Sequence, residues 1–496
     1  MRECAKSLPR SAKSRRVLPW LLLACLLATA CRTGGSDAIL GPVERLNADP
    51  GTLGRFTFPY YTALGATDGG GAIAIWMRSE EQSRPLVYRR AADGNSPFGG
   101  ERYLSPETLR ETISIVPTLV EGSRSGELYA IWQARRPTSG DKLVVFRRSQ
   151  DSGETWGSAK TINSEPHSFI PAMAAGRNGS VYAVWTDERG EGIEVFFNRS
   201  LDHGETWLAA DAKVGVKLSR RSAAISVSIA TDGADRVLIV WEESGPGGRV
   251  IRAASSADRG ESWSEPVRVD DGGGRGAPSA PSIVFASGRA IVVWTAASTG
   301  EQAAGQLWSD VSGDGGSTWG EDVLLHEVEG GIPPRAHLVA VADKALAVFH
   351  AGPSGGAWDI HYAETDAAGG WQAQGKGGTR VSSGEGKFIN PRLAVDAGTS
   401  KVTYYVTYED DRKRIFLNRS IDAGKTWGTA NELVYAVGEG QGKAQARYPQ
   451  VAAADGVAYV MWEVWGDTTG MFKSLADLGK KVRPADLYVR RVSFRR

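Results

Sequence analysis

The sequence predicts a single all-β propeller built from four-stranded blades, and three observations support this fold class. The phrase Ser-x-Asp-x-Gly-x-Thr/Ser-Trp is written five times in the 496 residues. An apolar run that ends in an aromatic residue recurs eight times, at intervals of 53 to 59 residues. Short alternating runs such as Val181–Trp185 lie between Gly-rich turns, a pattern typical of strands. Repetition at one period predicts a repeat architecture.

Each position of the repeated phrase suits a tight hairpin turn. The Asp carboxylate accepts hydrogen bonds from nearby backbone amides, and the Gly allows the positive φ that the turn requires. The hydroxyls satisfy further backbone groups, and the Trp offers a large apolar surface. Because no catalytic residue is needed five times, we expect a structural role. The five copies contain Asp151 and Trp156, Asp202 and Trp207, Asp258 and Trp263, Asp314 and Trp319, and Asp422 and Trp427.

The phrase resembles the Asp box, also called the BNR repeat, of the sialidase-like propeller superfamily. The resemblance extends over nearly all of the chain after its leader. In that superfamily the box joins the third and fourth strands of a blade, on the face opposite the active site. The resemblance therefore implies a propeller that binds its ligand on the face opposite the boxes. It implies less about activity, because the superfamily contains sialidases, other glycosidases, receptors and many non-enzymatic proteins.

The aromatic anchors predict eight blades, with seven blades and one irregular insertion as the alternative. Two degraded boxes are expected, around Asp93 and from Asp366 to Trp371, and a proline such as Pro117 is expected to open most units. The chain ends one strand short, so an N-terminal strand around Pro42–Leu46 should complete the last blade and close the ring. The anchors are Trp76, Trp132, Trp185, Trp241, Trp294, Phe349, Tyr408 and Trp462.

The first 31 residues are expected to form a lipoprotein-type signal peptide that ends at a lipidated Cys31. Residues 1–16 carry six Lys or Arg, and the apolar run Val17 to Ala30 is too short for a comfortable transmembrane helix. Leu27–Cys31 resembles the lipobox of bacterial lipoproteins, while cleavage at Cys25 and ordinary secretion stay open as alternatives. Residues 32–40 would then be a short linker and residues 41–496 the propeller.

These features predict an exported protein, anchored by lipid to the cell envelope and to the outer membrane if the cell is Gram-negative. No other membrane contact is expected. The three cysteines all lie in the leader, so the predicted propeller has no disulfide. Residues 17–496 hold 52 Lys or Arg and 56 Asp or Glu, a net charge of −4 without a basic stripe, so nucleic acid is not an expected partner. The six His lack metal-ligand spacing, so we expect no metal and no cofactor.

Charged loops are expected on the face opposite the boxes, where the chain leaves each anchor. Ion pairs that only fix these loops, Asp187 with Arg189 and Asp411 with Arg414, are the alternative interpretation. The candidate ligand-binding residues are Arg135, Arg136, Asp187, Arg189, Glu242, Asp411, Arg412 and Trp465.

The resemblance to sialidases implies three arginines that bind the substrate carboxylate, a Tyr nucleophile paired with a Glu, and an Asp acid/base. The family places its first Arg in a Phe-Arg-Ile-Pro motif, but this sequence reads Phe56-Thr57-Phe58-Pro59 there. Eight units also differ from the six typical of sialidases. A site rebuilt from other blades would use the catalytic candidates Tyr448, Arg447, Arg392, Arg335, Asp187 and Asp411.

The sequence therefore favours a non-catalytic, envelope-anchored propeller that binds a glycan or an envelope protein on the face opposite the boxes. An exo-α-sialidase or another glycoside hydrolase is the first alternative, and an envelope assembly scaffold is the second. The pattern predicts neither the identity of the ligand nor the oligomeric state.

Overall fold

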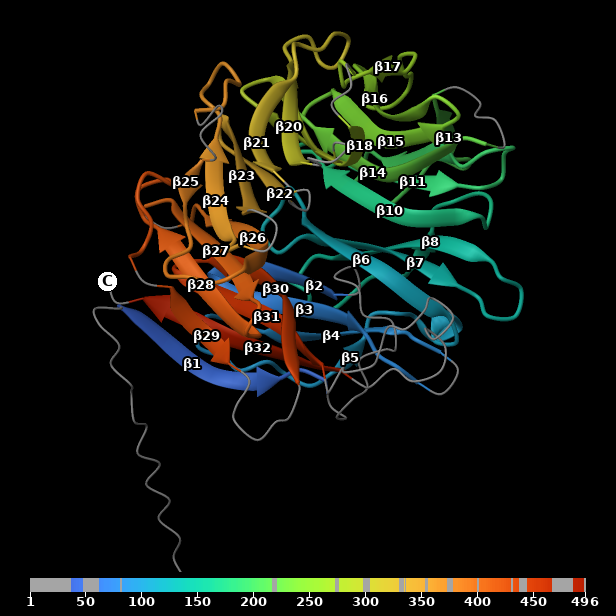
Figure 1. The fold of residues 1–496 in the computed structure, drawn as a ribbon. Helices are drawn as coiled ribbons and strands as arrows, with labels where there is room; N and C mark the ends of the chain where they lie inside the picture. Colours follow the sequence, from blue (N-terminus) through green and yellow to red (C-terminus); the bar gives the residue numbers. More distant parts are fainter. Residues whose placement is uncertain are drawn as a thin grey trace, which may run out of the picture. The chain divides into compact units, whose positions relative to one another are not determined.

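The structure, a computed structural model, separates residues 1–36 from a second unit, residues 37–496. The predicted signal peptide and Cys31 lie outside the described residues. Within the second unit the structure forms eight four-stranded antiparallel sheets, which confirms the predicted eight-bladed all-β propeller (Figure 1). The structure describes residues 37–47, 62–80, 83–215, 221–272, 276–297, 304–329, 334, 336–352, 356–372, 378–398, 401–429, 431–436, 444–465 and 485–494.

Blades 1 to 4 each use four strands in chain order. Blade 1 contains β2 (Thr62–Thr67), β3 (Gly71–Met77), β4 (Leu86–Ala91) and β5 (Arg102–Tyr103). Blade 2 contains β6 (Ile113–Glu121), β7 (Leu128–Arg135), β8 (Lys142–Ser149) and β9 (Lys160–Thr161). Blade 3 contains β10 (Ser168–Ala175), β11 (Val181–Asp187), β12 (Glu194–Ser200) and β13 (Ala212–Val214). Blade 4 contains β14 (Ala223–Thr231), β15 (Val237–Gly245), β16 (Gly248–Ser256) and β17 (Val267–Arg268).

Blades 5 to 7 repeat this order, and blade 8 takes its fourth strand from the N-terminus. Blade 5 contains β18 (Ala277–Ala286), β19 (Arg289–Ala297), β20 (Ala304–Ser312) and β21 (Val323–Glu329). Blade 6 contains β22 (Ala336–Val341), β23 (Lys344–Ala351), β24 (Asp359–Glu364) and β25 (Thr379–Arg380). Blade 7 contains β26 (Phe388–Asp396), β27 (Thr403–Asp410), β28 (Arg414–Ser420) and β29 (Glu432–Ala436). Blade 8 contains β30 (Gln445–Ala454), β31 (Val457–Trp465), β32 (Ala485–Phe494) and β1 (Ala38–Arg45).

The ring closes as the sequence predicts. The first strand of each blade contacts the first strand of the next, and the series ends where β30 contacts β2. In blade 8, β1 pairs antiparallel with β32, with Leu40 opposite Val492 and Arg45 opposite Tyr488. Joining the two ends of the chain in one sheet leaves no open blade at the closure. Within the described ranges the helices are two short 3-10 turns, η1 (Asp68–Gly70) and η2 (Glu107–Leu109), and none is long and apolar enough to cross a membrane.

The first strand of six blades carries the same β-bulge. The bulged residue is not glycine, yet its φ lies between 38° and 55° in every case. A proline follows it in five blades, as Pro117 follows Val116, so the prolines lie inside the first strand and the expectation that they open the unit is wrong. A bulge tolerates Pro because its missing N–H is not needed for the ladder. The bulged residues are Val116, Ile170, Ser226, Ala280, Asn390 and Tyr448.

The hydrophobic core lies between the blades. One cluster joins Ile75 and Tyr88 of blade 1 to Trp132 and Val145 of blade 2, and the other described joints are built in the same way. The aromatic anchors fill these joints, and Trp132 is among several that are fully buried. Because each sheet buries its apolar faces only against its neighbours, the ring is stabilised as a whole.

The five Asp boxes share one network of hydrogen bonds. In blade 7, Ser420 Oγ donates to Asp422 Oδ1 at 2.8 Å and accepts from the N–H of Gly424 at 2.8 Å. The N–H and hydroxyl of Thr426 donate to the same carboxylate at 2.9 and 2.6 Å. These bonds, the Thr426 hydroxyl first, lower the pKa of Asp422 to about 2. The boxes join the third and fourth strands, as predicted, and their role is structural.

Each box also binds the preceding blade. In blade 3, the Trp207 ring packs edge-on against Phe146 of blade 2, with ring centroids 4.9 Å apart. Gly204 has a φ of 81°, and a Cβ there would collide with the same Phe146 ring. Arg148 of blade 2 donates to the carbonyl of His203 inside the box at 2.9 Å. The box is therefore a clamp between blades as well as a turn.

Replacement of the box glycine of blade 3 tests this clamp. Gly204→Ala should lower the free energy of unfolding by about 2–4 kcal/mol, because the new Cβ adds positive-φ strain and a collision with Phe146. Urea unfolding followed by tryptophan fluorescence measures the loss. Gly100→Ala, where a Cβ meets nothing within 4 Å, is the control and should change stability by less than about 0.5 kcal/mol. Equal effects of the two changes would contradict the clamp.

Candidate functional site

A cavity of about 740 Å³ lies at the centre of the ring, between the first strands of six blades. Its wall is formed mainly by the starting and middle parts of these strands, and β19 and β20 of blade 5 add Val293, Trp294, Thr295 and Leu307. The first strands begin on the face opposite the boxes, so the cavity lies toward that face. The lining mixes hydroxyl, amide, imidazole and guanidinium groups with apolar and aromatic side chains, and among the described lining residues none is Asp or Glu. The lining residues are Thr62, Ala63, Leu64, Pro117, Thr118, Leu119, Ser279, Ala280, Ser282, Val293, Trp294, Thr295, Leu307, Ala336, His337, Asn390, Arg392, Tyr448, Pro449 and Gln450.

A second central cavity, of about 440 Å³, lies toward the box face. It is lined by the far ends of β2, β6, β26 and β30 and by the turns that follow them. Several acidic residues line it, among them Asp68 and Asp396, and both accept hydrogen bonds from backbone N–H groups of glycines. Its acids are therefore used in part to hold turns. Among the described residues no group of three His, Cys, Asp or Glu is placed to hold a metal ion.

Glu409, at the end of β27, links blade 7 to blade 8 beside the first cavity. Asn390 Nδ2 donates to its Oε1 at 2.9 Å, and the N–H of Tyr448 donates to its Oε2 at 2.5 Å. Arg447 Nη1 lies 3.6 Å from Oε1. Burial raises the pKa of Glu409 to about 7, because Arg447 and the hydrogen bonds offset only part of the cost of burying the charge.

The position of Glu409 repeats around the ring. It is the residue directly after an aromatic anchor, and its side chain reaches the bulge of the next blade. Gln133 of blade 2 accepts a hydrogen bond from the N–H of the bulged Ile170 at 3.2 Å. Glu242 of blade 4 accepts one from the bulged Ala280 at 3.4 Å. Glu409 therefore has structural counterparts, one of which is a neutral amide.

Glu463 occupies the same position in blade 8. Its side chain is 2% exposed, and Trp465 Nε1 donates to its Oε2 at 2.8 Å. Burial raises the pKa of Glu463 to about 8, and the nearby charge of Glu409 adds to the rise. The Trp465 ring in turn packs against Tyr448, with centroids 5.9 Å apart. Two carboxyl groups that are easily protonated at neutral pH thus lie behind the cavity wall.

His337 is fixed as a neutral hydrogen-bond donor in the wall. The N–H of Leu393 donates to its Nδ1 at 3.2 Å, so the ring proton is on Nε2. Burial lowers the pKa of His337 to about 3, and the charge of Arg392 contributes to the fall. With Asn390, Arg392 and Gln450, it gives the cavity several donors on the side of blades 6 to 8.

The family model of the BNR repeat-like domain matches residues 61–460. The chain belongs to the BNR repeat-like family. This assignment and the fold confirm the predicted resemblance to sialidase-like propellers.

Comparison with individual proteins adds little to this assignment. No curated protein matches this BNR propeller. Among solved structures it is similar to the α-L-arabinanase of Penicillium chrysogenum, with 17% sequence identity and a TM-score of 0.40; the match covers 59% of this chain and 89% of that chain. It is also similar to Trypanosoma rangeli sialidase, with 14% sequence identity and a TM-score of 0.37; this match covers 69% of this chain and 56% of that chain. Scores this low carry no argument about substrate.

The predicted catalytic residues of the BNR propeller do not converge on one place. Arg392 and Tyr448 line the cavity, and Arg447 lies behind it against Glu409. Asp187 and Asp411 are not among the described lining residues, and Arg335 lies outside the described residues. Tyr448 contacts Glu409 through its backbone N–H.

Two of the predicted ligand-binding residues, Asp187 and Arg189, bind each other and stabilise their own loop. Arg189 Nη2 lies 2.8 Å from Asp187 Oδ2, and its Nη1 lies 2.8 Å from Asp211 Oδ1, so the alternative of a loop-fixing ion pair is confirmed there. The pair expected between Asp411 and Arg414 is wrong, because Arg414 binds Asp410 at 2.6 Å. Within the described lining of the cavity none of the eight candidates appears: Arg135, Arg136, Asp187, Arg189, Glu242, Asp411, Arg412 and Trp465. Arg135, Asp187, Glu242 and Trp465 lie in the second strand of a blade, and the other four lie in the loop that follows it, one strand away from the axis.

Sequence reasoning did not assign Asn390 or Gln450 to the wall, and it identified Trp294 only as a buried anchor. It did not select Glu409 or Glu463 as site residues. A usable signal was present, since a polar residue next to the bulge proline faces the axis in blades 7 and 8. A polar residue directly after a buried anchor was the second signal.

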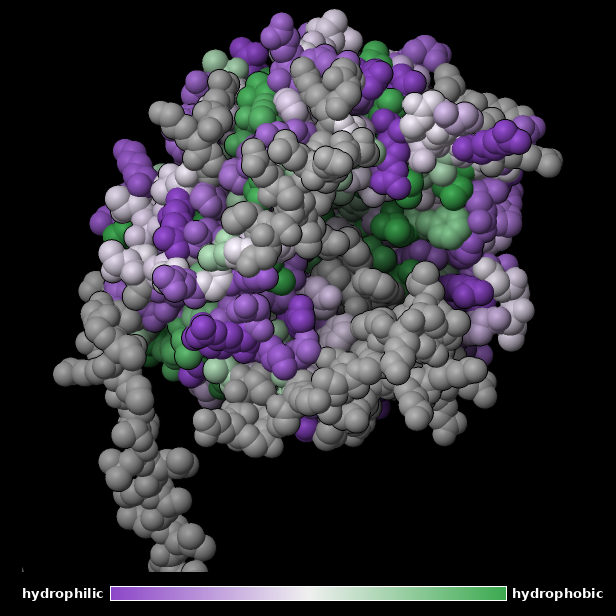
Figure 2. Space-filling view, in the orientation of Figure 1, coloured by the Kyte–Doolittle hydropathy of each residue, from purple (hydrophilic) through white to green (hydrophobic). Residues whose placement is uncertain are grey.

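Figure 2 shows mainly hydrophilic side chains on the described surface in view, with hydrophobic ones near β10 and β14, where Ile170 and Ile225 are 50% and 36% exposed.

Two substitutions of Glu409 test whether its side chain is needed as a hydrogen-bond acceptor or as a negative charge. Glu409→Gln should cost less than about 1 kcal/mol, because Gln133 makes the equivalent bond in blade 2. Glu409→Ala should cost about 2–3 kcal/mol, because it leaves two buried donors without an acceptor. Urea unfolding at pH 5 measures both losses.

The pH dependence provides a second readout. The pKa of Glu409 is about 7 in the folded protein and about 4.3 in the unfolded chain. The contribution of Glu409 to the free energy of unfolding of wild type should therefore be lost as the pH rises from about 4.5 to 7. Glu409→Gln should remove this part of the pH dependence of the free energy of unfolding between pH 5 and pH 8. Equal losses for the Gln and Ala variants at pH 5 would contradict the structural role, because Gln keeps an acceptor for the Tyr448 N–H and Ala does not.

Proposed function

We propose that this BNR propeller binds a glycan without cleaving it, in the central cavity on the face opposite the Asp boxes. The observation that carries the proposal is the chemistry of the wall: among the described lining residues there are polar donors and aromatic rings but no carboxylate. Most glycoside hydrolases place a pair of carboxyl groups on either side of the scissile bond. A cavity without them suits recognition.

The size and lining of the cavity suit a sugar. A volume of about 740 Å³ lies within the range of small-molecule sites, about 300–1,000 Å³. Hydroxyls such as Thr295, the amides of Asn390 and Gln450, and the ring of Trp294 offer the mixed polar and apolar contacts that a sugar ring requires. Arg392 adds a guanidinium, the group best shaped to bind a carboxylate. An acidic sugar is therefore the proposed ligand.

Two carboxyl groups behind the wall, those of Glu409 and Glu463, are engaged elsewhere. Glu409 accepts bonds from Asn390 and from the Tyr448 backbone, and Glu463 accepts one from Trp465. Neither is a described lining residue. Tyr448 meets Glu409 through its N–H, whereas a sialidase nucleophile would require its hydroxyl near that carboxylate. These contacts favour binding over hydrolysis.

The leader sequence places this binding outside the cytoplasm in our proposal. We propose export and lipid anchoring at Cys31, on the basis of the basic segment, the apolar run and the lipobox-like residues that precede that cysteine. The ligand would then be a glycan of the envelope or its surroundings. An assembly scaffold, the other alternative, would use an outer surface and leave the cavity empty.

Arg392→Ala should weaken binding of an acidic oligosaccharide at least tenfold, because a charge-assisted hydrogen bond contributes about 1.5–3 kcal/mol. Isothermal titration calorimetry against a panel of neutral and acidic oligosaccharides measures the change. Arg412→Ala is the control, because Arg412 is exposed on a loop away from the described lining.

Other outcomes point to the alternatives. Release of an aryl group from an α-sialoside by wild type, abolished by Tyr448→Phe, would replace binding by catalysis. Folded protein that binds no oligosaccharide of the panel would favour the scaffold.

A further inference from the structure

The side chain two residues before the box serine closes the joint between two blades. In blade 3 this residue is Asn198. Its Nδ2 donates to the carbonyl of Ile162, directly after the last strand of blade 2, at 2.8 Å, and to the carbonyl of Leu208, directly after the box Trp, at 3.1 Å. Its Oδ1 accepts from the N–H of Arg199 at 2.7 Å. One amide thus joins the outer strand of one blade to the box of the next.

Two other blades use the same arrangement. In blade 7, Asn418 Nδ2 donates to the carbonyls of Val381 and Gly428 at 2.7 and 3.1 Å. Its Oδ1 accepts from the N–H of Arg419 at 2.8 Å. In blade 2 the donor is Arg147, which reaches the carbonyls of Leu104 and Gly157, both at 2.7 Å. In all three joints an N–H donor faces two carbonyl oxygens.

Blade 5 has a carboxyl group at this position. Asp310 Oδ1 accepts from the N–H of Val311 at 2.6 Å, as Asn Oδ1 does in blades 3 and 7. Oδ2 therefore takes the place of the amide nitrogen, and the equivalent carbonyls belong to Val269 and Gly320. The residue is 1% exposed, and no described group is a hydrogen-bond partner of Oδ2. An ionised carboxylate would place its charge against two carbonyl oxygens.

We propose that Asp310 is a neutral carboxylic acid in the folded protein and donates its proton to these carbonyls, so that the joint between blades 4 and 5 is a pH-sensitive switch. A protonated carboxyl supplies the donor that the Asn residues supply elsewhere. Loss of the proton removes the donor and leaves a buried charge in its place. The joint should therefore loosen as the pH rises.

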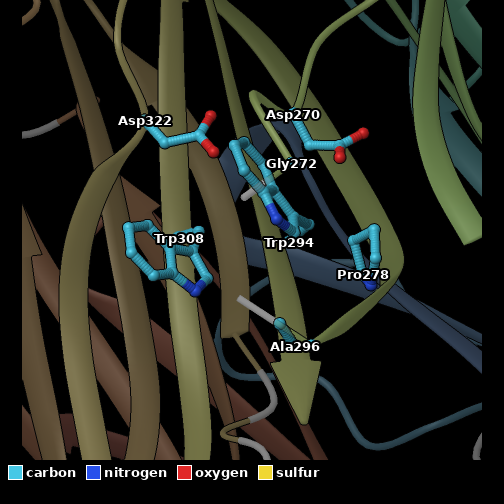
Figure 3. A pocket seen from close by; sticks show the side chains of 8 residues that line it. Asp270, Gly272, Pro278, Trp294, Ala296, Trp308 and Asp322 are labelled. Atoms are coloured by element: carbon cyan, nitrogen blue, oxygen red, sulfur yellow. The ribbon is translucent and has the colours of Figure 1, made fainter. Parts of the chain in front are cut away.

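The surroundings of Asp310 favour the neutral form. Burial raises its pKa to about 7, and the charges of Asp322 and Asp271 add to the rise, while hydrogen bonds from the backbone N–H groups of Val311 and Gly320 offset part of it. Arg268, a cation at this joint, binds Asp270 at 2.6 Å. Figure 3 shows Asp270 and Asp322 on opposite sides of the Trp294 ring, where they line a cavity of about 20 Å³. That volume holds about one water molecule, so water has room to enter the joint.

The sign of the effect follows from linkage. The folded pKa of about 7 lies above the unfolded value of about 3.9, so the contribution is complete below pH 4 and is lost as the pH rises to about 7. Asp310→Asn supplies an N–H donor at every pH. The full chain with this change should melt several degrees above wild type at pH 8, and the gap should narrow sharply at pH 5.

A reciprocal variant and a direct readout complete the test. Asn198→Asp builds the same carboxyl into blade 3 and should melt below wild type at pH 8, with a smaller deficit at pH 5. The infrared difference spectrum between wild type and Asp310→Asn at pH 6 should contain the carbonyl band of a protonated carboxylic acid.

Two results would overturn the proposal. One is a melting difference between Asp310→Asn and wild type that is the same at pH 5 and pH 8, without the protonated-acid band. The other is a melting temperature that calcium raises and a chelator lowers in wild type but not in Asp310→Asn, which would assign the position to a metal ion.

Discussion

Each blade of this propeller buries its sheet faces only against the blades on either side, and the rest of the structure depends on this constraint. The apolar clusters, such as the one around Trp132, each draw on two consecutive blades. The polar contacts cross the same joints: Arg148 reaches the box of the next blade, Glu409 reaches the next bulge, and Asn198 reaches the previous outer strand. A joint that fails therefore exposes two blades, which is why the N-terminal strand β1 is needed to complete blade 8.

The sequence predicts features whose partners are close along the chain. The box of blade 7 needs only the eight residues from Ser420 to Trp427, so its turn can be read directly. The blade count follows from the anchors, because a buried aromatic is needed at every joint. The bulge before Pro117 could not be read, because it is defined by the register with the neighbouring strand. Arg189 looked like a ligand-binding residue because its second partner, Asp211, lies 22 residues away on another loop.

The candidate site shows how the same constraint shapes chemistry. The wall of the central cavity comes mainly from the first strands, whose bulges carry polar residues such as Asn390 toward the axis. Two carboxyl groups behind this wall, those of Glu409 and Glu463, are buried in the joints and have raised pKa values. These acids therefore serve the joints of the ring, where Glu409 accepts hydrogen bonds from Asn390 and from the bulged Tyr448.

Because the blades repeat, the residue at one position can be compared between blades. The position two residues before the box serine holds Arg147 in blade 2, Asn198 in blade 3, Asp310 in blade 5 and Asn418 in blade 7. In blade 4 it holds Ala254. Ala254 shows that the ring tolerates a joint without this bond, so a weaker joint in blade 5 is compatible with folding. Blade 5 also supplies Trp294 to the wall of the central cavity. The joint that holds Asp310 and the wall of the proposed ligand site therefore share blade 5.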